Sequence, residues 1–137
     1  MSGWWFVTLV ELKSPKDRLY LKDGTESKGL RKARSQLADW LIWRKRHPTA
    51  FRSELAKLVT KLNSPQSCSG YSDAASEVLD PRMEVSVDEQ IFIGRRGALS
   101  FEDQARRVAS YPSRPDTIAT YDRILDCARA FERKTKG

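Results

Sequence analysis

Trp4-Trp-Phe-Val-Thr-Leu-Val-Glu-Leu-Lys13 is the stretch of this chain that decides its fold. Aromatic and β-branched residues dominate it, no Gly or Pro interrupts it, and it ends just before Ser14-Pro15. An uninterrupted apolar run of this kind is typical of a strand buried on both faces inside an α/β sheet. The stretch therefore predicts an inner strand.

The segments that follow alternate between helical and extended patterns. Apolar residues three or four positions apart predict helices over residues 30–47 and 51–62. Ser100 predicts the start of another helix, because Asp103 stands in the capping-box position. The remaining predicted elements are a short extended piece at 19–21, strands at 90–94 and 117–120, and a last helix at 121–133.

This order predicts one α/β domain over residues 1–137, with a sheet flanked by helices. Residues 63–81 are rich in Ser and Gly and predict a long internal loop that carries a short helix at 73–79. A loop of that length in a small domain favours either mobility or a functional role for it.

The charge of the chain favours a polyanionic partner. Its 137 residues carry 25 Lys and Arg against 18 Asp and Glu, a net charge of +7. Residues 1–50 hold most of the excess, with 11 basic and 5 acidic side chains. This balance excludes an acidic, calcium-buffering protein and is compatible with nucleic-acid binding.

Several other classes are excluded by what the chain lacks. The longest apolar run, Trp4–Val10, is far shorter than the roughly 20 residues of a membrane helix. With no secretory signal pattern and only two cysteines, the sequence predicts a cytoplasmic protein with reduced thiols. The single histidine, His47, has no catalytic partner nearby in the sequence, so carboxylates, Lys and a metal are the expected chemical groups.

Glu11 and Lys13 are the strongest candidates for chemistry. They are two residues apart on the predicted strand, so both side chains leave the same face of the sheet, next to the strand end. A carboxylate there can bind Mg²⁺ through oxygen, and a lysine beside it can orient water or balance charge on a phosphate. The alternative is a simple ion pair at the end of a strand.

Longer motifs around this pair resemble a known family. Glu11-Leu-Lys13, a loop, and a helix with Gln36 and Trp40 resemble the Glu-x-Lys strand and Gln helix of restriction-endonuclease-like, PD-(D/E)XK nucleases. The order and spacing resemble in particular the nuclease domain of the Shedu family of bacterial anti-phage defence proteins. Ile91–Arg96 and Thr117–Leu125 resemble that family's late strand and terminal strand with its Thr-Tyr-Asp helix.

The resemblance implies a metal-dependent DNA endonuclease with a mixed central sheet flanked by helices. Glu11 and the Leu12 backbone carbonyl would bind Mg²⁺ or Mn²⁺. Lys13 would position the attacking water, and Gln36 would orient the lysine or the water. The resemblance also implies a homo-oligomer and an N-terminal regulatory region in the full-length protein.

One part of the family pattern is missing. Nucleases of this kind have an acid on the strand before Glu-x-Lys, whereas no acid precedes Glu11 here. The favoured explanation is that the sequence begins inside the nuclease domain, one strand late. Alternatively, Asp23, Glu26 or another subunit supplies the acid, or the domain binds DNA or mediates assembly without cutting.

Basic clusters on either side of the Gln helix are candidate contacts to the phosphate backbone of DNA. The alternative for them is a solvated helix face. A Gly-Arg-Arg motif after the second strand adds two further candidates, because guanidinium groups match phosphate geometry. The predicted nucleic-acid-binding residues are Arg31, Lys32, Arg34, Arg44, Lys45, Arg46, Arg95 and Arg96.

Two further interpretations concern aromatic and acidic side chains. Trp4, Trp5 and Trp40 are predicted to lie in the core, and Trp43 is the tryptophan expected to be exposed. Asp122 is interpreted as a charge in the first turn of the last helix rather than a metal ligand.

Overall fold

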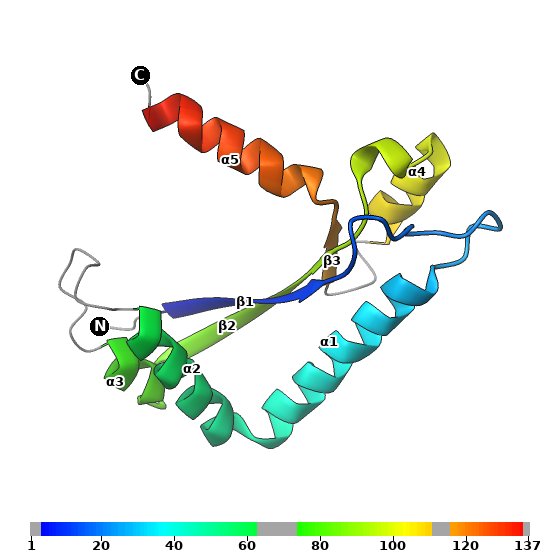
Figure 1. Ribbon diagram of the computed structural model, residues 1–137. Helices are drawn as coiled ribbons and strands as arrows, with labels where there is room; N and C mark the ends of the chain where they lie inside the picture. Colours follow the sequence, from blue (N-terminus) through cyan, green and yellow to red (C-terminus); the bar gives the residue numbers. More distant parts are fainter. Residues whose placement is uncertain (1–3, 63–73, 111–115, 136–137) are drawn as a thin grey trace. The chain divides into compact units, whose positions relative to one another are not determined.

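The computed structural model describes residues 4–62, 74–110 and 116–135 (Figure 1). The chain divides into two compact units, which we name the first unit (Met1–Val7 and Asp39–Val87) and the second unit (Thr8–Ala38 and Asp88–Gly137). The elements are β1 (Trp4–Leu12), α1 (Lys28–Arg46), α2 (Pro48–Leu62), α3 (Ala74–Leu79), β2 (Glu84–Phe92), η1 (Arg96–Ala98), α4 (Phe101–Ala109), β3 (Asp116–Ala119) and α5 (Asp122–Thr135).

The three strands form one sheet in the order β1-β2-β3. β2 and β3 pair in parallel, with Ile91 opposite Ile118. The Lys13 N–H donates to the Phe92 carbonyl at 2.9 Å, and β1 runs in the same direction as β2 (Figure 1). The prediction of a mixed sheet is therefore wrong for the described residues. Helices rather than hairpins connect these strands, and such connections produce parallel pairs.

The core of the second unit lies between α1 and one face of the sheet. Leu30 and Ala33 of α1 are fully buried against Ile91, Ile93 and Ile118. The three-residue spacing puts Leu30 and Ala33 on one side of α1. The alternation along β2 and the residue after it puts Ile91 and Ile93 on the sheet face that packs against this helix. This packing fixes α1 over the face of the sheet that also carries Glu11 and Lys13.

β1 is not buried on both faces, contrary to the prediction. Its residues alternate between exposed and half-buried, and Leu12 is 60% and Phe6 74% exposed. β1 is an edge strand of the sheet, and only the face with Leu9 packs against the core cluster of the second unit. The apolar run therefore predicted the strand correctly and its burial incorrectly.

The predicted helices are confirmed within a few residues, including the capping box of α4, in which the Ser100 hydroxyl accepts from the Asp103 N–H. The short helix in the Ser-rich region is confirmed as α3, while residues 63–73 of the predicted loop lie outside the described residues. β2 begins six residues earlier than predicted, because polar and apolar residues alternate from Glu84 to Asp88 on a half-buried strand.

The tryptophans correct the sequence analysis. Trp4 is 57% and Trp40 53% exposed, so neither belongs to the core, and Trp5 is only half-buried. Trp43 is exposed as predicted, and its ring lies 6.3 Å from the Trp40 ring and 5.8 Å from the His47 ring. The helical spacing of Trp40 indicated a helix, but the buried stripe of α1 passes through Leu30, Ala33 and Leu37 instead.

The first unit contains α2 packed against α3, with Phe51, Ala56 and Val78 buried. Arg52 of α2 holds the chain that follows α3. Its guanidinium donates to the carbonyls of Val78 (2.9 Å), Asp80 (3.1 Å) and Met83 (2.7 Å). One half-buried side chain thus satisfies three backbone acceptors at the end of a short helix.

We expect Arg52→Gln to lower the free energy of unfolding by about 1–3 kcal/mol, because it leaves part-buried carbonyls without their charged donor. Arg82→Gln is the matched control, since the Arg82 side chain is 87% exposed in its ion pair with Asp80 and surface pairs of this kind contribute little. Urea denaturation of both variants checks the prediction. Equal stabilities would contradict the anchoring role of Arg52.

Candidate functional site

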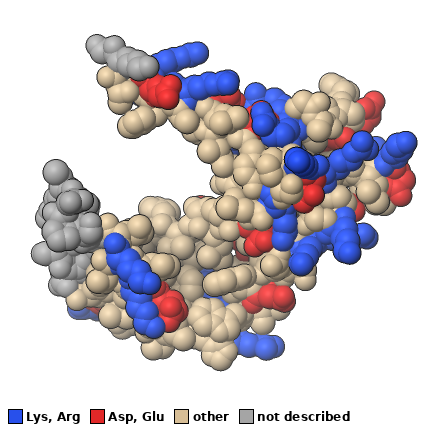
Figure 2. Space-filling view, viewed as in Figure 1, with Lys and Arg blue, Asp and Glu red and all other residues tan. Residues whose placement is uncertain are grey.

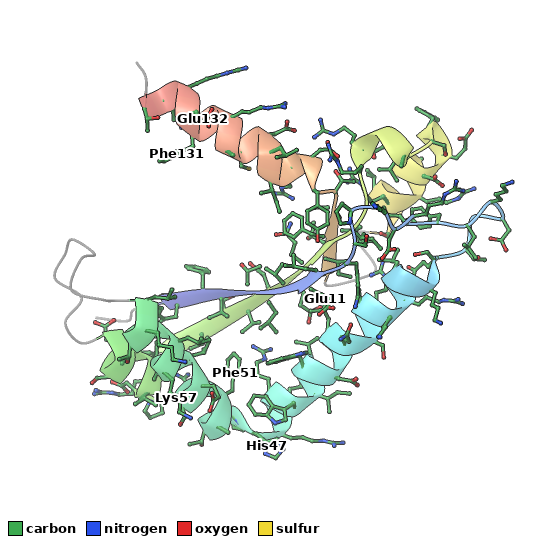
Figure 3. The ribbon with its side chains drawn as sticks, viewed as in Figure 1. Glu11, His47, Phe51, Lys57, Phe131 and Glu132 are labelled. Carbon is green, nitrogen blue, oxygen red and sulfur yellow. The ribbon has the colours of Figure 1, made fainter. Side chains whose placement is uncertain are left out.

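Glu11, Lys13 and Gln36 come together in the second unit. Lys13 follows the last residue of β1, and Gln36 lies on α1, which covers that face of the sheet. The Lys13 Nζ donates to Gln36 Oε1 at 2.6 Å and pairs with Glu11 Oε1 at 2.8 Å. Figure 3 shows Glu11 on the side of β1 that faces α1. The strand and the helix thus bring together three residues that the sequence singled out.

Lys13 and Glu11 each keep one polar group that is available to a ligand. The side chains of Lys13 and Glu11 are 15% and 19% exposed, so both are sheltered yet accessible. An ammonium has three N–H donors, of which two are used here. Glu11 binds Lys13 through Oε1, and no described residue donates a hydrogen bond to Oε2. One donor and one carboxylate oxygen therefore stay available to a ligand.

Two hydrogen bonds fix the backbone at Lys13, the residue that follows β1. The Lys13 N–H donates to the Phe92 carbonyl at 2.9 Å, and the Tyr121 hydroxyl donates to the Lys13 carbonyl at 2.5 Å. The Tyr121 ring also lies 6.1 Å from the Phe92 ring. Tyr121 thus fixes the backbone at Lys13, a contact that the sequence analysis did not single out, since only the Thr-Tyr-Asp motif pointed to its region.

The Leu12 carbonyl points away from β2. A trans peptide places this carbonyl opposite the Lys13 N–H, which points toward Phe92 of β2. In the described sheet no strand pairs with that edge of β1. A backbone oxygen and the Glu11 carboxylate are hard oxygen donors of the type that Mg²⁺ prefers, and Mg²⁺ keeps several waters when it binds. These donors fit a magnesium or manganese ion.

The described residues contain no group of three or more His, Cys, Asp or Glu placed to hold a metal. The loop acids considered as substitutes have other partners. Asp23 accepts from the Thr25 hydroxyl at 2.7 Å, which lowers the pKa of Asp23, and Glu26 pairs with Arg34 at 2.9 Å.

Glu89 is a buried acid that the sequence analysis missed. It lies on β2, is 6% exposed, and is two residues before Ile91, so it shares the sheet face of the core isoleucines. The prediction began this strand at residue 90 and left Glu89 outside it. The signal that would have found it is the alternation of polar and apolar residues from Glu84 to Asp88, which continues in register to Ile91 and so includes Glu89 in the strand.

The predicted phosphate contacts differ in their surroundings. Arg31, Lys32, Lys45 and Arg46 are exposed, whereas Arg34 is engaged with Glu26, and the Arg44 guanidinium lies 5.9 Å from the Phe51 ring centre. On the face shown in Figure 2, basic side chains are spread over the surface with acidic ones between them. The exposed members remain the stronger candidates for DNA contacts.

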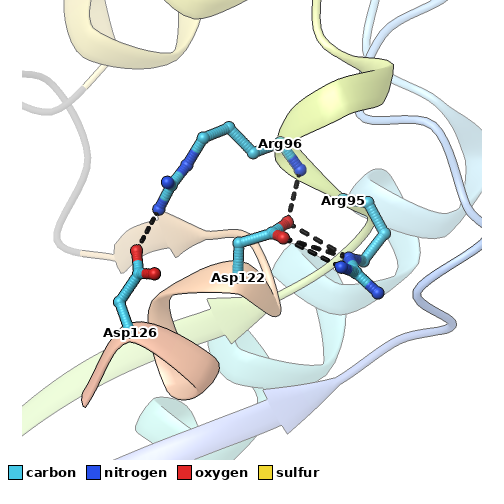
Figure 4. A network of polar contacts seen from close by, with 4 residues as sticks. All are labelled: Arg95, Arg96, Asp122 and Asp126. Carbon is cyan, nitrogen blue, oxygen red and sulfur yellow. Dashed lines mark hydrogen bonds and ion pairs between the residues drawn. The ribbon is translucent and has the colours of Figure 1, made fainter. Parts of the chain in front are cut away.

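Arg95 and Arg96 are bound to acids of α5 (Figure 4). The Arg95 guanidinium pairs with Asp122 at 2.9 Å, and the Arg96 guanidinium pairs with Asp126 at 2.5 Å. The Arg96 backbone N–H also donates to Asp122 at 2.6 Å. Asp122 thus stands in the first turn of the last helix, as predicted, and additionally ties η1 to α5.

The hydrogen bond from Arg95, assisted by the Arg96 N–H, lowers the pKa of Asp122 from 3.8 to about 2. A depressed folded-state pKa stabilises the fold above the unfolded value, and the contribution is lost as pH falls through the folded value. We therefore expect Asp122→Asn to be less stable than the parent chain above pH 4, with the difference disappearing toward pH 2. Urea denaturation between pH 2 and 6 measures it.

Asp39→Asn is the control for this experiment, because Asp39 is exposed on α1 and forms no ion pair with the described residues. Its stability should follow that of the parent chain at pH 6. A difference between Asp122→Asn and the parent that stays constant down to pH 2 would contradict the role given to the Asp122 carboxylate.

A known protein family matches most of this chain. The model of the family described as Shedu protein SduA, C-terminal, matches residues 1–125. The chain belongs to this family. Membership in the Shedu family indicates a role in anti-phage defence, and the matched residues include Glu11, Lys13 and Gln36. Comparisons with curated proteins and with solved structures gave no match. In the described part of the chain, no helix is long and apolar enough to cross a membrane.

Proposed function

We propose that this Shedu chain is a metal-dependent DNA endonuclease with a restriction-endonuclease-like core. The observation that carries the proposal is the position of the Lys13 Nζ between Glu11 Oε1 and Gln36 Oε1, at the end of a sheet strand. Ligand sites of open α/β sheets gather at such strand ends. A partly sheltered lysine fixed by two acceptors and placed beside a carboxylate is well suited to act on a phosphodiester.

The residues have distinct roles in the proposed reaction. Hydrolysis forms a P–O bond to the water oxygen and breaks a P–O bond to a deoxyribose oxygen, which takes up a proton. Lys13 uses its third N–H to orient the water or to balance charge on the phosphate, while Gln36 fixes the lysine. Glu11 and the Leu12 carbonyl would hold Mg²⁺ or Mn²⁺, which supplies Lewis-acid stabilisation of phosphate charge when bound.

DNA is the proposed substrate because the first 50 residues carry the basic excess of the chain. Incubation of the chain with plasmid DNA, with Mg²⁺ or Mn²⁺ and with EDTA, tests the proposal. Metal-dependent nicking or linearisation is the expected result. Cleavage that continues in EDTA would contradict it.

A second candidate function is a nuclease-fold domain that binds DNA or mediates assembly without cutting. It is favoured by the described residues, which contain no group of three or more His, Cys, Asp or Glu placed to hold a metal. DNA retardation with a steep salt dependence, without cleavage in either metal, would support it. The predicted homo-oligomer is compatible with either function, and light scattering measures the oligomeric state.

A further inference from the structure

A small cavity lies at the carboxyl end of β3 in the second unit. Its volume is about 150 Å³, and its wall is formed by residues 118–120 and three arginines, Arg96, Arg107 and Arg123. The arginines come from three separate elements, η1, α4 and α5. None of the lining residues is acidic, and none belongs to the Glu11–Lys13–Gln36 site.

The charges around this cavity are only partly balanced by the protein. Arg96 pairs with Asp126, whereas neither Arg107 nor Arg123 forms an ion pair with a described acid. The Arg107 Nε is buried and has no hydrogen-bond partner within the described chain. A buried donor without an acceptor costs about 1–3 kcal/mol, and three guanidinium groups around one cavity repel one another. An anion in the cavity relieves the repulsion among the guanidinium groups.

The chemistry of the wall selects phosphate. Guanidinium groups donate in pairs to the oxygens of a tetrahedral anion. Thr120 also lines the wall and is only 3% exposed, so the cavity includes a well-buried polar residue. Sites for larger organic ligands usually have about 300–1,000 Å³, so a cavity of this size suits one phosphate group rather than a whole nucleotide.

We infer that Arg96, Arg107 and Arg123 form a phosphate-binding pocket beside the end of β3. Because the strands are parallel, their carboxyl ends lie at the same end of the sheet. The pocket at the end of β3 is therefore at the end of the sheet where β1 leads into the Glu11–Lys13 pair. The phosphate is either an internucleotide diester of DNA or a free phosphomonoester. The inference goes beyond the proposed nuclease activity and does not depend on it, because binding here requires no metal.

The experiment is calorimetric titration of the whole chain with inorganic phosphate in EDTA. We expect Arg107→Gln and Arg123→Gln each to weaken phosphate binding at least about tenfold, since each removes a charge-assisted contact. Arg129→Gln is the matched control, because Arg129 lies on α5, is exposed and does not line the cavity. It should bind phosphate as the parent chain does.

Arg107→Lys separates binding from folding, because it keeps the charge and loses the guanidinium fork. It should fold and bind with intermediate affinity. Competition identifies the source of the phosphate: a short duplex displaces inorganic phosphate if the ligand is a diester, and deoxyadenosine monophosphate displaces it if the ligand is a monoester. Phosphate binding that is absent from the parent chain, or unchanged in folded Arg107→Gln and Arg123→Gln, would overturn the inference. Glu11→Gln should bind phosphate normally, whatever its effect on cleavage.

Discussion

Glu11→Gln is expected to lower the rate of Mg²⁺-dependent DNA cleavage by at least about 100-fold. The substitution preserves size but removes the charge that pairs with Lys13 at 2.8 Å and that is proposed to hold the metal. Lys13→Met should have a similar effect, since it removes the N–H donor that is proposed to act on the water or the phosphate. Plasmid cleavage followed over time, with DNA affinity measured separately in Ca²⁺, distinguishes lost chemistry from lost binding.

The chain contains a matched control pair. Glu54 and Lys57 form an ion pair at 2.7 Å on α2, but their side chains are 59% and 67% exposed. Glu54→Gln and Lys57→Met make the same chemical changes and should leave cleavage at the parent rate. Cleavage by Glu11→Gln or Lys13→Met at the parent rate would remove these residues from the proposed site.

Substitutions of Gln36 are expected to lower the cleavage rate less than substitutions of Lys13. Its amide oxygen accepts from the Lys13 Nζ at 2.6 Å, so Gln36→Ala leaves the lysine charged and less well oriented. The expected loss of rate is smaller than for Lys13→Met, and Gln36→Glu should restore part of the orientation because it keeps an acceptor. A variant ranking in which Gln36→Ala is the most damaging would show that the amide contacts the reacting groups directly.

The catalytic candidates were accessible from the sequence because their pattern is local. Strand alternation alone puts Glu11 and Lys13 on one face, and helical periodicity places Gln36 one turn from the buried Ala33 and beside Leu37. The contact of Lys13 with Gln36 could not be derived in this way, because it depends on how α1 is seated over the sheet. The family resemblance supplied that pairing.

What the sequence analysis missed depends on tertiary packing. The apolar stretch of β1 looked like an inner strand, yet its neighbours cover one face only, and a run of apolar letters does not report strand order. Arg107 and Arg123 stand in ordinary amphipathic helices, so nothing local marks them as the wall of one cavity. Arg95 looked like a free phosphate contact, and its pairing with Asp122 joins positions 27 residues apart.

Gly94 forms backbone hydrogen bonds to two segments that are distant in the sequence. Its N–H donates to the Ser14 carbonyl at 3.2 Å, and its carbonyl accepts from the Tyr121 N–H at 3.1 Å. It therefore joins the loop after β1 to the start of α5, which are the segments that flank Lys13. Its φ of +66° is a left-handed conformation that side chains disfavour.

Gly94→Ala is expected to lower the free energy of unfolding by about 2–5 kcal/mol, as the sum of left-handed strain and overpacking. A Cβ at this position would lie 2.6 Å from the Asp17 carbonyl oxygen and 3.0 Å from Leu19 Cδ1. The first of these neighbours is backbone and cannot move without displacing the loop after β1. Chemical denaturation of the variant measures the loss.

Gly97→Ala is the control, because a Cβ at Gly97, three residues further along the same connection, would meet no described atom within 4 Å. Its stability should stay close to that of the parent chain. If Gly94→Ala is as stable as Gly97→Ala, the junction of Ser14, Gly94 and Tyr121 does not constrain the fold. If Gly94→Ala is destabilised but its folded fraction cleaves DNA normally, the junction supports the sheet without positioning Lys13. We expect Gly94→Ala to lose stability and also to cleave DNA more slowly per folded molecule. The reason is that Gly94 holds both the loop after β1 and the segment of Tyr121, whose hydroxyl donates to the Lys13 carbonyl.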